Sequence, residues 1–383
     1  MVSLIVSRMM FFKIDDSVIE MLAVGQPPAN ISLCIDELFR SRRLGYHLIY
    51  CKASGLEVIE RVVGISETTK RTIKKIKQQQ RFKKAAFELM TTYVNVVAAP
   101  GVVRRLSLGT KVVIEISIDQ LATGDFLGAT TLLAENLTDC ELYQNITSIA
   151  NRSSDVLASM RHRLSCVSGG GSQTPRQYRQ QKKNRALTLC IVDGDIEYQG
   201  APLGTNTALP IYTDEVANPV PHCSALILSC YSIENLMPAK IIVDATGLGA
   251  PVSPYLNKIT QYQHEEFWPY IPLKLGKNCG NFIDATPKGN YWYSQKLSFS
   301  PSNPACNSWI GGVCEQPCEV LEKMPSKTAQ LVAEYLSVAK NNGKLSDVAG
   351  MISPLPPTIN KLWVDISLSL NSWVCSGDRI TAY

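Results

Sequence analysis

The chain contains 383 residues, of which 45% are hydrophobic and 19% are charged. A chain of this composition is not intrinsically disordered, and its length allows about two domains with cores of their own. The formal net charge of +5 permits a nucleic-acid partner without requiring one, because the distribution of charge matters more than its sum. Twelve cysteines in no even framework, in a chain far longer than disulfide-stapled mini-domains, predict buried thiols in a reducing cytoplasm.

The N-terminal segment is expected to begin an α/β unit. Residues 1–12 are apolar, but Arg8 interrupts them, two aspartates follow and no small-residue cleavage site stands out, so a first strand is favoured over a signal peptide. Helical spacing over residues 31–43 and a strand over residues 46–51 continue the alternation. No apolar run approaches the length that spans a bilayer, so a soluble protein without a membrane contact is expected.

Residues 68–90 form the most basic segment and are predicted to be helical. Ile73, Ile76, Phe82 and Phe87 are its expected buried stripe. Its cations either contact phosphates or form a solvated face, which is the usual role of a charge run. The candidate nucleic-acid contacts, in this segment and in a second basic stretch over residues 176–185, are Lys70, Lys74, Lys77, Arg81, Lys84, Arg176, Lys182 and Lys183.

A strand predicted over residues 111–118 is expected to close the N-terminal unit, which we assign to residues 1–125. Four carboxylates in this part of the chain could form a second acidic site, as in PIN-like nucleases. Ordinary surface carboxylates are the favoured interpretation. The four are Asp15, Glu37, Glu57 and Asp119.

Acidic residues follow three of the four strands predicted in the middle of the chain. These strands span residues 130–136, 163–167, 186–192 and 224–229. The carboxylates are Glu135 with Asp139, Asp193 with Asp195, and Glu234. Because the carboxyl ends of parallel strands lie at one edge of a sheet, where open α/β folds bind their ligands, we expect these side chains to meet there.

Each of these features also has an ordinary structural explanation. The Asp-Gly pair at residues 193–194 is a signal for a hairpin turn, although a strand that is hydrophobic throughout favours a buried parallel strand. Glu234 could simply cap the next helix. The glycine run over residues 169–171 could bring the backbone close to a phosphate, or it could be a plain loop.

In order and spacing these segments resemble the Toprim domain, in the form found in OLD-family nucleases and their ATPase-free relatives among bacterial anti-phage effectors. The family's strand end, apolar-Glu-Gly-x-x-Asp, corresponds to residues 133–139, its Asp-x-Asp to residues 193–195, and its Ile-Glu-Asn-like segment to residues 233–235. Asn136 stands where the family has glycine. The resemblance covers about residues 128–240, and residues 363–373 carry a weaker similarity.

The resemblance implies an α/β fold with a Toprim-like, mainly parallel sheet flanked by helices over residues 126–240, after the N-terminal α/β unit. A C-terminal α+β extension would cover residues 241–383. The implied chemistry is phosphodiester cleavage with two Mg²⁺ or Mn²⁺ ions: one lowers the pKa of an attacking water and the other stabilises the leaving oxygen.

The resemblance also assigns roles to residues of this sequence. Glu135, Asp193 and Asp195 would coordinate metal, Asp139 and Glu234 would complete or orient the sites, and Glu135 is the candidate general base. A lysine would meet the phosphate. Lys274 is the first candidate for this role, and Lys277 and Lys288 compete with it.

The resemblance also implies that the protein is a cytoplasmic endonuclease of DNA or structured RNA. It would be the toxic effector of an anti-phage system, and a partner protein or a phage trigger would release its activity. The sequence contains no Gly-x-x-x-x-Gly-Lys-Ser/Thr loop, so any ATPase partner would be a separate polypeptide. A homodimer is also considered. The alternatives are a topoisomerase- or primase-like Toprim enzyme and a non-catalytic nucleic-acid-binding or scaffold subunit.

The C-terminal third gives three further expectations. Cys279, Cys306, Cys314 and Cys318 could bind zinc, but their spacing is not a repeated CxxC pair, so buried or free thiols are favoured. Residues 326–342 predict an amphipathic helix. The tryptophans are expected to pack in the core rather than stack on bases; they are Trp268, Trp292, Trp309, Trp363 and Trp373.

Overall fold

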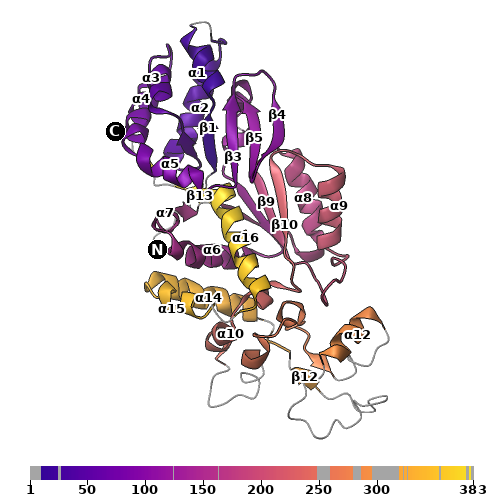
Figure 1. Ribbon diagram of the computed structural model, residues 1–383. Coiled ribbons are helices and arrows are strands. Elements are labelled where there is room, and N and C mark those ends of the chain that lie inside the picture. The colour runs from indigo at the N-terminus through magenta and orange to yellow at the C-terminus, as the bar shows by residue number, and fades with distance from the viewer. Residues whose placement is uncertain are drawn as a thin grey trace.

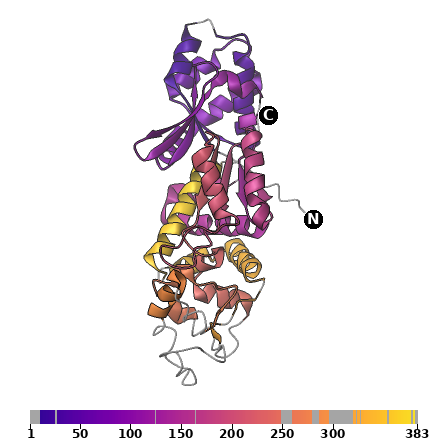
Figure 2. The ribbon, with the colours of Figure 1, turned by 90° about the vertical axis from the view of Figure 1, so that its right-hand side faces the viewer.

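The computed structural model describes most of the chain, with gaps. The described residues are 10–24, 27–123, 125–162, 164–247, 259–278, 286–295, 319–321, 323–325, 327–352, 355–376 and 379–380. Two mainly parallel sheets flanked by helices and a largely helical C-terminal region follow one another along an elongated molecule (Figures 1 and 2). The α/β class expected from the sequence is therefore confirmed.

The N-terminal sheet has the strand order β2-β1-β3-β5-β4. Its strands are β1 (Phe11–Ile14), β2 (Leu48–Tyr50), β3 (Thr92–Val97), β4 (Val103–Leu108) and β5 (Lys111–Ser117). All neighbours run parallel except β4, which pairs antiparallel with β5 at the edge. The strands expected near residues 12, 48 and 114 are all present.

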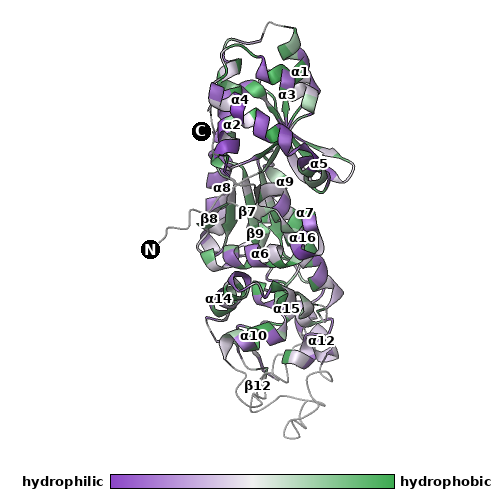
Figure 3. Cartoon of the chain, turned by 90° about the vertical axis from the view of Figure 1, so that its left-hand side faces the viewer, coloured by the Kyte–Doolittle hydropathy of each residue, from purple (hydrophilic) through white to green (hydrophobic). Residues whose placement is uncertain are grey.

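Five helices accompany this sheet: α1 (Asp16–Ala23), α2 (Ile31–Leu44), α3 (Ala53–Glu60), α4 (Glu67–Gln78) and α5 (Gln80–Glu88). The basic segment is thus two helices that meet at Gln79, and α4 is coloured mostly as hydrophilic in Figure 3. Ile73 and Ile76 are buried as predicted, but Phe82 is 39% exposed and Lys83 is only 1% exposed. The expected stripe is wrong at Phe82 because the break at Gln79 turns a different face of α5 inward, whereas Phe87 is partly buried and packs against Phe11 and Tyr93.

The central sheet has the order β10-β9-β6-β8, and every pair of neighbours is parallel. Its strands are β6 (Thr131–Ala134), β8 (Ser165–Ser168), β9 (Thr188–Val192) and β10 (Cys223–Ile227), joined through α6 (Leu137–Ala150), α8 (Thr174–Lys183) and α9 (Ala208–Ala217). Every residue of β9 is buried, as a strand covered on both faces requires. Between β6 and β9 the strand order reverses, which is where doubly wound sheets bind their ligands.

The C-terminal region packs below the carboxyl edge of the central sheet (Figure 1). It contains the 3-10 helices η5 (Ile233–Leu236) and η6 (Trp268–Tyr270), the short strands β11 (Lys277–Asn278) and β12 (Glu319–Leu321), and the helices α10 (Ala239–Thr246), α12 (Pro287–Ser294), α14 (Thr328–Asn341), α15 (Leu345–Gly350) and α16 (Pro357–Val374). The helix expected over residues 326–342 is confirmed as α14.

The tryptophans of the described residues are all buried, as expected of core side chains; they are Trp268, Trp292, Trp363 and Trp373. Trp309 lies outside the described residues. Within the part of the chain that the structure describes, no helix is both long enough and apolar enough to span a bilayer.

Candidate functional site

The acidic residues singled out in the sequence gather at the carboxyl edge of the central sheet. Glu135 follows β6, and Asp193 follows β9 on the adjacent strand. Asp139 lies in the first turn of α6, and Glu234 lies in η5, which follows β10. Adjacent parallel strands therefore deliver these carboxylates to the crevice where the strand order reverses. We call Glu135, Asp139, Asp193, Asp195 and Glu234 the acidic pole.

Asp139 and Glu234 are buried and the other three pole residues are partly buried, and the pole residues disfavour one another's ionisation. Burial raises the pKa of Glu135 to about 7, and the charges of Asp195 and Asp139 add to this. Burial likewise raises the pKa of Asp139 to about 6, although the Asn136 backbone N–H opposes the shift. The pKa of Asp193 rises well above its usual range because of burial and the nearby charges of Asp139, Glu234 and Glu135. Like charges in a low dielectric produce these shifts, and added positive charge would relieve them.

The glycine run after β8 holds Glu135 in place. The backbone N–H groups of Gly170 and Gly171 donate to the Glu135 carbonyl oxygen at 3.0 and 3.4 Å, and Ser168 Oγ donates to the same oxygen at 3.1 Å. The N–H groups of Gly170 and Gly171, which could have bound a phosphate, therefore already donate hydrogen bonds within the protein. The run acts here as a clamp on the backbone of a pole residue.

The Asp193-Gly194-Asp195 segment is a tight parallel-strand end. β9 and β10 run parallel, so the hairpin-turn alternative is wrong. A Cβ atom at Gly194 would collide with the Leu228 carbonyl oxygen, so only glycine fits between the two aspartates. Asp195 has a φ of 51°, in the left-handed region, and its N–H donates to the Tyr231 carbonyl oxygen at 3.2 Å.

The backbone at Asn136 is not strained. Its backbone is extended, with φ −133° and ψ 161°, and it is the N-cap of α6. Asp139 Oδ2 accepts a hydrogen bond from the Asn136 N–H at 2.9 Å, which completes a capping box. Asp139 therefore has a structural role in addition to any role at the pole.

Lys274 is the lysine that reaches the pole. Its Nζ lies 3.0 Å from Glu234 Oε1, while its side chain remains 51% exposed. The other two candidates lie farther along the same surface: Lys277 stands over the Trp292 ring, and Lys288 pairs with Glu197 at 2.8 Å. Of the three, Lys274 is the one with an ion pair to a pole carboxylate.

The donor set of the pole suits a hard divalent cation. Asp193 Oδ1 and Glu234 Oε2 are buried side-chain oxygens without a hydrogen-bond partner, which is costly unless a ligand satisfies them. Carboxylate oxygens are what Mg²⁺ and Mn²⁺ prefer. Across the described residues, no three His, Cys, Asp or Glu side chains form a ready-made metal cage. Cation binding at the pole therefore requires the carboxylate side chains to move closer together.

The candidate nucleic-acid contacts differ in accessibility. On α4 and α5, Lys74, Arg81 and Lys84 are exposed, whereas Lys70 pairs with Glu67 at 2.6 Å and Lys77 with Glu60 at 2.7 Å. On α8, Arg176 and Lys183 are exposed.

Lys182 is not available to a phosphate. Its side chain is 7% exposed, and its Nζ lies 2.7 Å from Asp214 and 2.8 Å from Glu215. Its expected role as a phosphate contact is wrong, because it stabilises the packing of α8 on α9.

The four carboxylates considered for a second acidic site are engaged locally. Asp15 caps α1 through the Ser17 N–H, Glu37 pairs with Arg40, and Asp119 accepts from the Ser117 hydroxyl. Glu57 is exposed on α3. Ordinary local roles, the favoured interpretation, account for them. The four cysteines considered for zinc lie outside the described residues.

Two features of the site were not anticipated. Tyr143 on α6 is fully buried beside the pole, and burial together with Asp193 and Asp139 raises its pKa well above the usual range. Glu197 and Tyr231 line a pocket next to the pole. The position of Glu197, two residues after Asp195, was the available signal for that pocket.

Comparison with protein families, curated proteins and solved structures finds no match to this chain. The functional argument therefore depends on the chain's own residues and their arrangement.

Proposed function

We propose that the protein is a metal-dependent endonuclease of the Toprim type that cleaves phosphodiester bonds in DNA or structured RNA. The observation that carries the proposal is the acidic pole: buried or partly buried carboxylates at the ends of three adjacent parallel strands, two of them with unsatisfied oxygens, beside the half-exposed Lys274. The order of the motifs along the chain supports the Toprim assignment.

In this proposal Asp193, Asp195 and Glu135 hold the cations, and Asp139 and Glu234 orient the site. Bound Mg²⁺ or Mn²⁺ supplies Lewis acidity for the attacking water and for the leaving oxygen. Glu135 has a pKa of about 7, raised by burial, which suits it to accept a proton from water near neutral pH. Lys274 is exposed enough to leave Glu234 and donate to a non-bridging phosphate oxygen.

The test is cleavage by the purified full-length protein. Plasmid and transfer RNA are incubated with Mg²⁺, with Mn²⁺ or with EDTA, using wild type, Asp193→Ala and Asp365→Ala. Asp365 is a carboxylate on α16 that pairs with Lys361, so its variant controls for loss of a charge elsewhere. We expect metal-dependent cleavage by wild type and Asp365→Ala and none by Asp193→Ala. Equal cleavage by all three proteins would show that the pole is not the active site.

The effector role, with release by a partner protein such as a separate ATPase, is part of the proposal. It predicts that cleavage by the isolated chain is weak and rises when the partner or trigger is added. The competing function is a non-catalytic scaffold, in which the pole is a structural cation site; absence of cleavage with every candidate partner, together with cation binding, would favour it. A topoisomerase- or primase-like activity would give rejoined or extended products instead of shorter fragments.

A further inference from the structure

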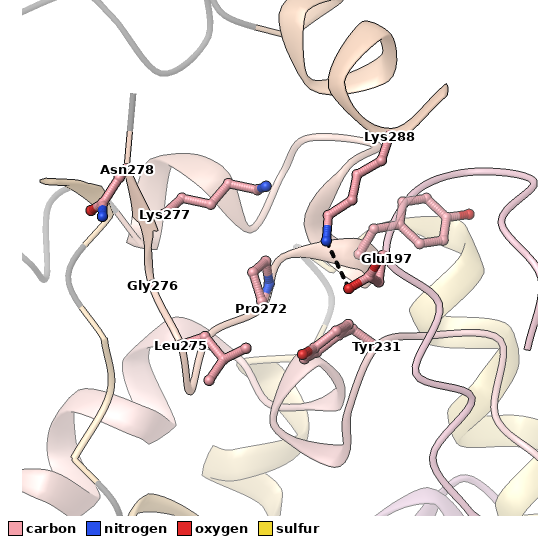
Figure 4. Close-up of a pocket in the computed structure, with 9 residues that line it drawn as sticks. Glu197, Tyr231, Pro272, Leu275, Gly276, Lys277, Asn278 and Lys288 are labelled. Atoms are coloured by element: carbon pink, nitrogen blue, oxygen red, sulfur yellow. Dashed lines mark hydrogen bonds and ion pairs between the residues drawn. The ribbon is translucent and has the colours of Figure 1, made fainter. Parts of the chain in front are cut away.

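A pocket of about 230 Å³ lies directly beside the acidic pole. It is bounded by Glu197 and Tyr231, by Pro272 and the following residues to Asn278, and by Lys288 (Figure 4). Tyr231, which lines the pocket, lies close enough to Asp195 and Lys274 to be affected by their charges. Glu197 is two residues beyond Asp195, and the segment that ends at Lys277 also carries Lys274.

Two lysines converge on this pocket from different elements. Lys277 on β11 is only 3% exposed, and its Nζ lies 3.8 Å from the centroid of the Trp292 ring. Lys288 on α12 reaches in from the opposite side and pairs with Glu197 Oε1 at 2.8 Å. Figure 4 shows both ammonium groups turned toward the same space.

The pocket is chemically suited to a small anion. Its lysines outnumber its one carboxylate, and Tyr231 and Tyr270 add aromatic walls with hydroxyl groups. Burial and the charge of Lys288 lower the pKa of Lys277 to about 7, so an anion placed between the two lysines would favour its charged form. The volume is below the roughly 300–1,000 Å³ of sites for drug-sized ligands, which suits a single phosphate with part of its sugar.

We propose that this pocket binds a phosphate group and holds the phosphate next to the scissile one on the substrate strand. The second part rests on the proposed nuclease function. Lys277 and Lys288 would contact the phosphate oxygens, as lysines commonly do in phosphate sites. When the phosphate enters, the ion pair between Glu197 and Lys288 would break, because the Glu197 carboxylate repels the phosphate. Glu197 therefore weakens binding, and removing its charge should strengthen it.

The experiment is isothermal titration calorimetry on the full chain in EDTA. The ligands are inorganic phosphate, pyrophosphate, and a dinucleotide with and without a 5′-phosphate. The variants are Lys277→Met, Lys288→Met and Glu197→Gln. Lys361→Met is the matched control, because Lys361 is likewise an exposed lysine in an ion pair, with Asp365 at 2.7 Å.

We expect the phosphorylated dinucleotide to bind at least as tightly as inorganic phosphate and more tightly than its unphosphorylated form. Lys288→Met and Lys277→Met should each weaken phosphate binding about tenfold, Glu197→Gln should tighten it severalfold, and Lys361→Met should leave it unchanged. If Lys277→Met does not fold, the opposite shifts of Lys288→Met and Glu197→Gln still decide the question.

The phosphate site is refuted if Glu197→Gln does not tighten binding, or if Lys361→Met weakens it as much as Lys288→Met does. Binding of inorganic phosphate without binding of the phosphorylated dinucleotide would overturn the placement on the substrate strand. These outcomes are independent of the nuclease test: phosphate binding in EDTA without any metal-dependent cleavage would remove the proposed function and leave the phosphate site standing.

Discussion

At the scale of single residues, the acidic pole is an arrangement that opposes folding. Asp193 is buried next to Asp139, Glu234 and Glu135, and its Oδ1 has no hydrogen-bond partner. An ionised carboxylate in such a place loses its hydration and gains repulsion. Residues that oppose folding in this way are typical of functional sites, because a bound ligand can compensate for them.

Asp193→Asn should therefore stabilise the metal-free protein while abolishing its function. The amide keeps the shape of the side chain and removes the charge, so we expect the midpoint of thermal unfolding in EDTA to rise by several degrees. Addition of Mg²⁺ or Mn²⁺ should raise the midpoint of wild type but not that of the variant, since ligands that bind only the folded state stabilise it. Differential scanning fluorimetry measures both effects.

Asp365→Asn is the control for this prediction, because its carboxylate is partly exposed and paired with Lys361. It should change neither the midpoint in EDTA nor the response to metal. If Asp193→Asn is less stable than wild type in EDTA, the Asp193 carboxylate has favourable partners in the folded protein and does not oppose folding.

At the scale of elements, α5 contains an unusual buried cation. Lys83 is 1% exposed, its Nζ has no hydrogen-bond partner, and burial together with the charge of Arg42 lowers its pKa to about 6. An ordinary lysine has a pKa of about 10.4. Between these two values the unfolded chain binds a proton that the folded chain does not, so the stability contributed at this site rises with pH.

Lys83→Met should stabilise the protein by a few kcal/mol at pH 7, because it removes the cost of deprotonating or burying the ammonium group. The gain should shrink as the pH rises toward about 10.4, above which the lysine is neutral in both states. Urea unfolding at pH 7, 8.5 and 10 measures the free energy of unfolding. Lys84→Met, on the exposed neighbour, should have little effect at any pH. A gain that stays constant with pH would show that hydrophobic contact, and not charge, is responsible.

Elements with strong periodicity could be predicted from sequence, and those fixed by tertiary contacts could not. The strand over Thr188–Val192 and the helix over Thr328–Asn341 were predicted because a hydrophobic run and a helical period are local signals. The break at Gln79 and the burial of Lys83 depend on how α5 packs, which the charge pattern of the helix conceals.

The same distinction applies to the site. The pole residues could be named from their positions after strands, because parallel strand ends meet at one edge. The burial of Lys182 against Asp214 could not be predicted, because the two residues lie on different helices and are 32 positions apart in the sequence. The clamp on the Glu135 carbonyl was also hidden: a glycine run signals conformational freedom without revealing which acceptor its amides will meet.

At the scale of the whole molecule, α16 ties the three parts together. Near its C-terminal end, Ser372 Oγ accepts from the Thr91 N–H at the start of the N-terminal sheet at 2.9 Å. The adjacent residue of α16, Asn371, donates to Asn151 Oδ1, just after α6, at 2.7 Å. Toward its start, Trp363 Nε1 donates to the Leu236 carbonyl oxygen in η5 at 2.8 Å, beside the pole. Figure 1 shows α16 running alongside the central sheet.

Asn371→Ala should destabilise the protein by about 2 kcal/mol, because it removes the two hydrogen bonds that Asn371 makes with the buried Asn151 amide. Chemical unfolding measures the loss. Asn341→Ala deletes the same group from an exposed position on α14 and should have an effect close to zero. Equal losses in the two variants would indicate that helix propensity, not the buried contact, sets the effect.

Helices α4 and α5, which carry the basic segment, and the acidic pole lie at opposite ends of the central sheet. Arg105 in β4 donates to the Cys223 carbonyl oxygen at the start of β10, whereas Glu234 pairs with Lys274 beyond the end of that strand. Five strand residues alone separate the two edges by about 16 Å. Cations on α4 and α5 therefore cannot touch the phosphates that enter the pole, and any nucleic acid that contacts both must be long.

This separation gives a length-dependent prediction. Charge removal on α4 and α5 should weaken binding of long duplexes and lower the slope of log affinity against log salt by up to about 3.6, while cleavage of short oligonucleotides is unchanged. The variant replaces four exposed cations by glutamine: Arg71, Lys74, Arg81 and Lys84. A control with the same charge change replaces four exposed cations elsewhere: Arg152, Lys240, Lys344 and Lys361.

Fluorescence anisotropy over a salt series measures the affinity. Equal weakening in both variants would assign the effect to net charge, and weakening for short oligonucleotides would place the basic helices at the pole, against the geometry.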